Sequence, residues 1–316
     1  MASRKNITAI PFFLSFCMLA QAQVVRRDSI EGGAVVTLTD VVVRSGMDVK
    51  GFISRVRSDT GFYKAFRNLR ILGFSSLNDI RVLDRSGAIK ASSYSRTRQT
   101  VDRGCRHTEK LSEEVKGDFY EDDGDYRYYT AKLYAGLFFA FDTVCGETNI
   151  VRGMERGIAG KSGIDKHKEQ LKMLFFDPGA RIPGIPFMGN KAAVFDPDNT
   201  KLYDLSIDIG DHDGHTVYIF TVKAREDLSA ADRDLIVIDE MTTLFDYSTF
   251  DVLSRQYRMS YDAGVYHFHV SMDVELERWR GYLLPRVIRY VGNWGVLFRQ
   301  REDCVFTATL FDFVEK

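Results

Sequence analysis

The chain has 316 residues, 45% of them hydrophobic and 28% charged. This composition is typical of a folded globular protein and excludes disordered, collagen-like and disulfide-scaffold chains. Lys and Arg number 43 against 44 Asp and Glu, a formal net charge of −1, so no overall field attracts nucleic acid and no nucleic-acid partner is expected.

Residues 1–22 are predicted to be a signal peptide. Arg4 and Lys5 supply its positive start, an apolar stretch follows, and Ala20 and Ala22 form a small-x-small cleavage motif. The apolar stretch is too short to cross a bilayer, which needs about 20 residues. We therefore expect cleavage after Ala22 and export to the periplasm or to the periplasmic face of the outer membrane.

Export places the remaining cysteines in a compartment that permits disulfides. Cys17 leaves with the signal peptide, so Cys105, Cys145 and Cys304 remain and at most one internal bridge is expected. Cys105 and Cys145 lie in the same half of the chain and are the expected pair. Cys304 alternates with apolar residues in a strand pattern, which predicts a buried, inert thiol.

After an extended arm over 23–46, helices are expected to follow Asp48 and Gly61, because apolar residues recur there at helical spacing. Strands are expected between about 71 and 145. Within that range the apolar, aromatic run 137–141 is interpreted as a buried strand.

A further helix is expected over 165–176, followed by a Pro-rich loop over 177–197. The prolines keep this loop out of a sheet, yet it carries apolar side chains whose exposure costs about 1.5–3 kcal/mol each. We therefore expect the loop to cover apolar surface as a lid; the alternative is a linker between two folded halves. The apolar lid residues are Ile182, Ile185, Phe187 and Met188.

From 198 to the end the sequence predicts an antiparallel meander, with strands at about 202–209, 216–224, 234–239, 252–261, 265–277, 283–291, 294–300 and 304–313. Alternation is clearest in 265–277. One face of that strand is apolar, and its ligand-facing candidates are Tyr266, Phe268, Val270 and Met272.

A sheet with one apolar and one polar face must be covered by helices or curl around itself. Few helices are available, so the expected fold is α+β and β-rich: a strongly curved antiparallel sheet, or half-barrel meander, with a few covering helices. We expect 47–316 to form this single domain.

The sequence shows no H-E-x-x-H, G-x-S-x-G or C-x-x-C motif, and no cofactor is expected. A zinc site is the alternative, with a metal-dependent hydrolase as its function. It would use His212, His215, His267 and His269. The simpler interpretation is that Asp213-Gly214 forms a hairpin turn and that the strand histidines are solvated.

The predicted architecture resembles the lipoprotein-carrier and lipoprotein-sorting superfamily of the bacterial envelope over about 47–316. The segments 59–66, 170–172 and 290–294 are similar to an uncharacterised group of exported proteins from Gram-negative bacteria. These resemblances imply an envelope location and the handling of lipid or lipoprotein. They provide no catalytic residues.

The leading hypothesis is a non-enzymatic envelope protein that holds an apolar moiety, a lipid acyl chain or a lipoprotein anchor, in a concave half-barrel. The alternative is an envelope scaffolding module whose Val-rich arm or sheet edge pairs with a partner protein.

Overall fold

The computed structural model describes residues 42–43, 48–151, 173–181, 190–262, 266–296 and 301–315. All of these belong to one compact unit, Thr37–Lys316. The predicted signal peptide and most of the predicted arm lie outside the described residues.

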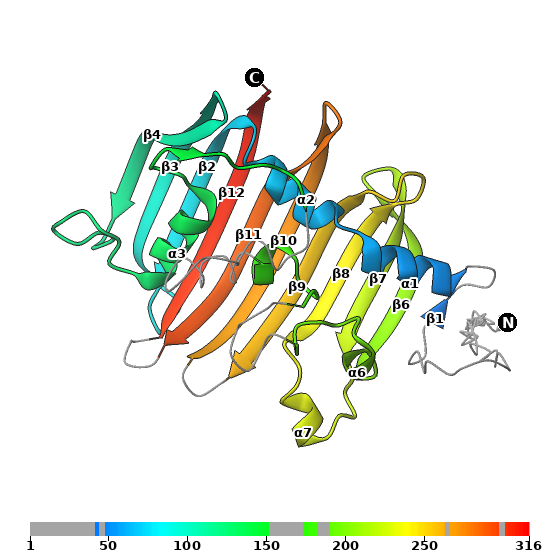
Figure 1. Ribbon diagram of the computed structural model, residues 1–316. Coiled ribbons are helices and arrows are strands. Elements are labelled where there is room, and N and C mark those ends of the chain that lie inside the picture. Colours follow the sequence, from blue (N-terminus) through cyan, green and yellow to red (C-terminus); the bar gives the residue numbers. More distant parts are fainter. Residues whose placement is uncertain are drawn as a thin grey trace, which may run out of the picture. The chain divides into compact units, whose positions relative to one another are not determined.

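The described residues form a 12-stranded sheet in the order β1-β6-β7-β8-β9-β10-β11-β12-β2-β3-β4-β5 (Figure 1). Only β1 pairs in parallel, with β6, and the sheet is open. The predicted α+β, β-rich class with a curved antiparallel sheet is confirmed. The strands are β1 (Val42–Val43), β2 (Gly73–Leu83), β3 (Ile89–Asp102), β4 (Cys105–Lys116), β5 (Val144–Cys145), β6 (Tyr203–His212), β7 (His215–Ala224), β8 (Ile238–Asp246), β9 (Val252–Asp262), β10 (Tyr266–Trp279), β11 (Tyr282–Val296) and β12 (Glu302–Val314).

The strands come from two parts of the chain that meet in the middle of the sheet. Strands β6 to β12 follow one another as a meander, as predicted, and β2 to β5 continue the sheet on the far side of β12. The β12–β2 contact joins residues more than two hundred positions apart, for example Phe306 with Ile80. The last strand of the chain is therefore an internal strand.

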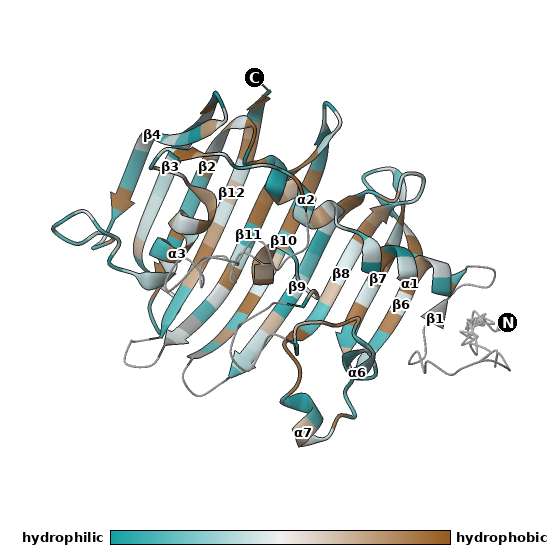
Figure 2. Cartoon of the chain, in the orientation of Figure 1, coloured by the Kyte–Doolittle hydropathy of each residue, from teal (hydrophilic) through white to brown (hydrophobic). Residues whose placement is uncertain are grey.

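The helices lie on one face of the sheet (Figure 1). They are α1 (Val49–Ser58), α2 (Gly61–Asn68) and α3 (Tyr129–Phe138), with two short helices, α6 (Pro197–Thr200) and α7 (Ala230–Arg233), near the ends of strands. Hydrophobic and hydrophilic residues alternate along the strands (Figure 2). The apolar set faces the helices, and we call that side of the sheet the inner face.

Helices α1 and α2 form where the sequence predicts them. Asp48 caps α1, and its Oδ1 accepts a hydrogen bond of 2.9 Å from the Gly51 backbone N–H. Phe52 of α1 packs edge-on against Tyr218 and Phe250, at 5.3 and 5.2 Å between ring centroids. These contacts hold α1 against the inner face over β7 and β8.

The predicted hairpin turn at Asp213-Gly214 is confirmed, because both residues have positive φ, as this turn type requires. Two strand predictions were wrong in their bounds. The predicted 234–239 strand begins at Ile238 and runs to Asp246, after Leu235 and Ile236 close the α7 turn.

The predicted break between 291 and 294 does not occur. Strand β11 is continuous there, because Gly292 pairs with Val270 on one side and with Cys304 on the other.

The interpretation of 137–141 as a buried strand was wrong, since Tyr129–Phe138 is helix α3. The helix lacks a side-chain cap from its own sequence. Its start is capped instead by Glu302 of β12, whose Oε1 accepts from Tyr129 N at 3.0 Å and whose Oε2 accepts from Thr130 N at 2.8 Å. A carboxylate at this end also suits the helix dipole. A cap from so distant a residue cannot be recognised by local pattern.

We expect Glu302→Ala to lower the free energy of unfolding by about 1–2 kcal/mol, because it leaves two N–H groups at the start of α3 without their charged acceptor. Urea unfolding followed by circular dichroism measures this loss. Asp303→Ala is the matched control, since Asp303 lies on the opposite face of β12. Equal losses in the two variants would show that the cap is not what stabilises α3.

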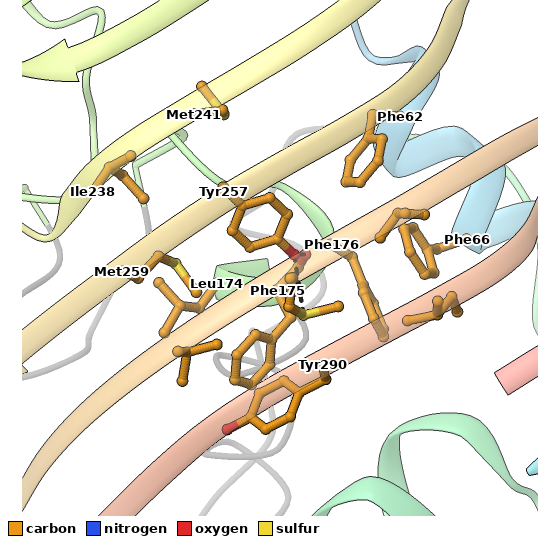
Figure 3. Packing of buried hydrophobic residues seen from close by; sticks show 14 of the residues in the cluster. Phe62, Phe66, Leu174, Phe175, Phe176, Ile238, Met241, Tyr257, Met259 and Tyr290 are labelled. Carbon is orange, nitrogen blue, oxygen red and sulfur yellow. Dashed lines mark hydrogen bonds between the residues drawn. The ribbon is translucent and has the colours of Figure 1, made fainter. Parts of the chain in front are cut away.

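The core between helices and sheet contains a short helical segment, Met173–Phe176, which is the described part of the predicted 165–176 helix. Its four side chains are buried. Phe176 stacks on Phe66 of α2 at 4.1 Å between ring centroids. Phe175 is directed toward Tyr290 of β11 (Figure 3). Tyr257 of β9 donates a hydrogen bond to the Phe175 carbonyl. This segment is thus anchored to the middle of the sheet.

Among the residues that the structure describes, no helix combines the length and the apolar character needed to cross a membrane.

Candidate functional site

A hollow of about 40 Å³ lies between α2, α3 and the strands β2 to β4. This volume holds water-sized molecules, whereas ligand pockets measure about 300–1,000 Å³. Its wall is apolar and aromatic on the side of the helices and cationic at its mouth. The hollow is lined by Tyr63, Phe66, Arg67, Leu69, Arg70, Phe74, Gln99, Arg106, Leu137, Phe138 and Phe176.

A second space, which we call the seam, continues from the hollow along the inner face. It is closely packed and has no room for a water molecule. Three residues, Leu137, Phe138 and Phe176, line both the hollow and the seam and therefore separate them. The remaining seam residues are Tyr134, Phe175, Met272, Tyr290 and Phe306.

The residues that separate hollow and seam are held by ring contacts. Phe138 packs on Phe176 at 5.6 Å and on Phe306 at 5.1 Å between ring centroids. Phe138 is the last residue of α3, and Phe176 directly precedes the 177–197 segment. Helix ends open more readily than helix centres. Movement of these two rings would join the hollow to the seam.

The mouth of the hollow is strongly basic. We define the rim as the three arginines that line the hollow, Arg67, Arg70 and Arg106, together with two residues beside them, Lys64 and Glu147. Glu147 pairs with Arg106 at 2.5 Å and with Arg70 at 3.1 Å. The rim thus combines four cationic side chains with one carboxylate.

Backbone carbonyls of the segment after Glu147 complete the rim. The Lys64 Nζ donates to the Asn149 carbonyl at 2.6 Å, and Arg67 donates to the Thr148 carbonyl at 2.6 Å. Burial lowers the pKa of Lys64, and the neighbouring charge of Arg67 lowers it further.

A disulfide between Cys105 and Cys145 fixes the segment that carries Glu147 beside β4. Its two cysteines also pair directly across β4 and β5. Glu147 lies two residues beyond Cys145, and Arg106 lies one residue beyond Cys105. The bridge therefore brings the carboxylate to the rim. Cys304, as predicted, is a buried free thiol, and burial raises its pKa.

The structure places the ligand-facing candidates of β10 on the inner face. Phe268, Val270 and Met272 are all buried, and Met272 lines the seam. The side chain of Tyr266 and the four predicted lid residues, Ile182, Ile185, Phe187 and Met188, lie outside the described residues.

Sequence analysis missed α3, Phe176 and the rim. One signal was available: Lys64, Arg67 and Arg70 recur at intervals of three residues along and just beyond a predicted helix, which places three cations on one side.

The four histidines of the alternative zinc site form two separate pairs. His212 and His215 face each other at the β6–β7 hairpin, while His267 and His269 lie on β10. Strand β10 is three strand spacings from β7, about 14 Å, and the two pairs lie toward opposite ends of β9. Within the described ranges, no group of three or more His, Cys, Asp or Glu side chains has the geometry to hold a metal ion.

A buried charge cluster underlies the junction of α1 and α2. Arg255 of β9 stacks on the Phe62 ring at 4.4 Å, and its Nε donates to Thr243 Oγ1 at 2.9 Å. Burial lowers the pKa of Arg255, and the charges of Asp59 and Asp177 act against that lowering. Burial raises the pKa of Asp177 to about 7, with Arg255 opposing the rise. Two carboxyls thus share one buried guanidinium.

The chain is similar to solved structures at low sequence identity. No family model matches the chain, and no curated protein matches it. Among solved structures, it is similar to a putative outer membrane lipoprotein-sorting protein domain from Vibrio parahaemolyticus (8% identity, TM-score 0.27, 80% of this chain and 91% of that one). It is also similar to a LolA superfamily protein from Nitrosomonas europaea (8% identity, TM-score 0.25, 81% and 91%) and to a DUF1329 family protein from Desulfovibrio piger (10% identity, TM-score 0.24, 81% and 94%).

Proposed function

We propose that this chain is a non-enzymatic protein of the cell envelope that binds an apolar chain, a lipid acyl chain or a lipoprotein anchor, between its helices and the inner face of its sheet. The observation that carries the proposal is the continuity of hollow and seam across Leu137, Phe138 and Phe176. The predicted signal peptide supports the location.

The ligand enters at the hollow and displaces Phe138 and Phe176. Its chain then lies along Met272, Tyr290 and Phe306, all apolar or aromatic side chains of the inner face. Each methylene group that leaves water contributes about 0.8 kcal/mol. Burial of a lipid acyl chain therefore offsets the cost of displacing the two rings. In the absence of ligand the rings close the space, which keeps the apolar surface of the seam from water.

The first test is direct. The full chain is purified without detergent from the envelope of an expressing Gram-negative host, extracted with organic solvent, and the extract is analysed by mass spectrometry. The proposal expects lipid in amounts approaching one molecule per protein. An envelope protein of similar size that is known to bind no lipid is carried through the same extraction as the control.

We expect Phe138→Ala to raise the affinity for dodecanol about 5–10-fold, because the ring no longer has to be displaced before the alkyl chain enters. Isothermal titration calorimetry on delipidated protein measures this. The matched control is Phe139→Ala, since the neighbouring ring packs on Phe141 at 5.2 Å and lines neither the hollow nor the seam. If both variants bind dodecanol as the wild type does, the alkyl chain does not enter by the seam.

The scaffolding alternative receives less support. Val42 and Val43 of the arm pair with Ser206 and Ile207 of β6, within the chain's own sheet. That part of the arm is therefore already engaged at one of the two edges of the sheet.

A further inference from the structure

The rim of the hollow carries more positive charge than its own groups balance. Arg67, Arg70 and Arg106 line the hollow, Lys64 lies close enough to Arg67 to feel its charge, and Glu147 is a carboxylate that pairs with Arg70 and Arg106. Long cationic side chains usually separate at a surface, because like charges in proximity repel one another. Their convergence beside an apolar hollow requires a physical reason.

Arg67 of the rim has a buried donor that nothing in the described part of the chain satisfies. One terminal nitrogen donates to the Thr148 and Ile150 carbonyls, at 2.6 and 3.4 Å. Its Nε is buried and has no hydrogen-bond partner among the residues that the structure describes. A buried donor without an acceptor costs about 1–3 kcal/mol, and more when it is charged. An anionic group at the mouth of the hollow would supply the acceptor.

The electrostatics of the rim agree with this geometry. Burial lowers the pKa of Arg67, and the charge of Arg70 lowers it further, against the opposing effects of the Tyr63 hydroxyl beside the guanidinium and of Glu147. An anion placed among these groups would relieve the repulsion and would accept charge-assisted hydrogen bonds, which are the stronger kind. Arginine is also the side chain best suited to carboxylate and phosphate, through its planar fork of donors.

We propose that the apolar ligand carries an acidic head group, a carboxylate or a phosphate monoester, which binds at Arg67 between Lys64 and Arg106 while its alkyl chain enters the hollow. This inference rests on the proposed function and adds the class of ligand to it. The ligand is then an anionic amphiphile, and neutral or cationic amphiphiles of equal chain length bind less well.

The test compares four amphiphiles that share one chain and differ in the head group: dodecanoic acid, dodecyl phosphate, dodecanol and dodecyltrimethylammonium. Each is titrated calorimetrically into the delipidated full chain, the charged amphiphiles below their micelle concentrations and dodecanol below its solubility limit. The two anions are expected to bind at least 10-fold more tightly than dodecanol, and the ammonium compound most weakly. The tighter of the two anions identifies the head group.

Arg67→Gln is expected to reduce the affinity for the preferred anion about 10-fold, to the level of dodecanol, and to leave the affinity for dodecanol unchanged. The matched control is Arg57→Gln, an exposed position in the last turn of α1. Melting temperatures check folding. Should Arg67→Gln fail to fold, Lys64→Gln tests the same rim, with an expected loss of about 3-fold for the anion alone.

The outcomes separate the two proposals. If none of the four amphiphiles binds, the proposed function fails. If dodecanol binds as tightly as the two anions, the head-group inference fails while the proposed function stands. Inorganic phosphate that binds as tightly as dodecyl phosphate would show an anion site without an apolar part, and would overturn the inference as well.

Discussion

Replacing Arg255 with methionine is expected to lower the free energy of unfolding at pH 8 by about 3–5 kcal/mol. Arg255 is 7% exposed, and it is the cation that the carboxyls of Asp59 and Asp177 share. Its removal leaves two partly buried carboxylates without a counter-charge. One of them is already poorly satisfied, since Asp59 Oδ2 is buried and has no hydrogen-bond partner within the described part of the chain. Loss of the guanidinium stacked on Phe62 adds to the effect.

The loss should depend on pH. Burial raises the pKa of Asp177 to about 7, so near pH 5 this carboxyl takes up a proton instead of remaining a buried anion, and the variant is expected to recover part of its stability there. Urea unfolding at pH 5 and pH 8 measures both values.

The control for Arg255→Met is Arg258→Met, an exposed position on the same strand whose side chain pairs with Glu240 at the surface. It should cost less than about 1 kcal/mol at either pH. A loss for Arg255→Met that matches the control, or that does not change with pH, would contradict this account of the cluster.

The parts of the fold that the sequence predicted correctly are those with local causes. The start of α1 follows from the Asp48 side chain and the first-turn N–H groups, and the β6–β7 hairpin follows from the backbone preferences of Asp213 and Gly214. The inner face of β10 follows from strict alternation, which buries Phe268 and Val270. In each case the residues that specify the element lie within the element itself.

The elements that the sequence predicted wrongly are specified by residues far away in the chain. The sequence of α3 is apolar and aromatic enough to resemble a buried strand, and the group that favours its helical start, Glu302, is supplied by β12. The pairing of β12 with β2 joins strands from opposite ends of the described chain, so no local pattern in either strand predicts it.

The rim is also assembled at long range. A disulfide brings Glu147 to Arg106, and the end of α2 brings Arg67. Periodicity within one segment carries no information about which segments meet. The sequence therefore predicted Met272 of the seam and, through the spacing of Lys64, Arg67 and Arg70, offered a signal for one side of the rim, but it did not show that these parts meet.

Asp177 is expected to make the wild type less stable as pH rises from about 4 to 7. A carboxyl in the unfolded chain titrates near pH 4, whereas burial raises the pKa of Asp177 in the folded protein to about 7. Between these values the folded state holds a proton that the unfolded state has released. The free energy of unfolding therefore decreases across this window and, for this group, is constant above it.

Asp177→Asn removes that titration. At pH 8 the variant should be more stable than the wild type by about 1–2 kcal/mol, less than the full linkage value because Asp177 keeps partial contact with solvent. Near pH 4 the two proteins should be nearly equal, since Asp177 is then protonated and resembles the amide in charge. Urea midpoints at pH 4, 6 and 8 measure the difference, and Asp198→Asn, at an exposed position in α6, serves as the control. A difference between Asp177→Asn and the wild type that is the same at all three pH values would show that the ionisation of Asp177 is not its source, and that the carboxyl is already charged throughout this range in the folded protein.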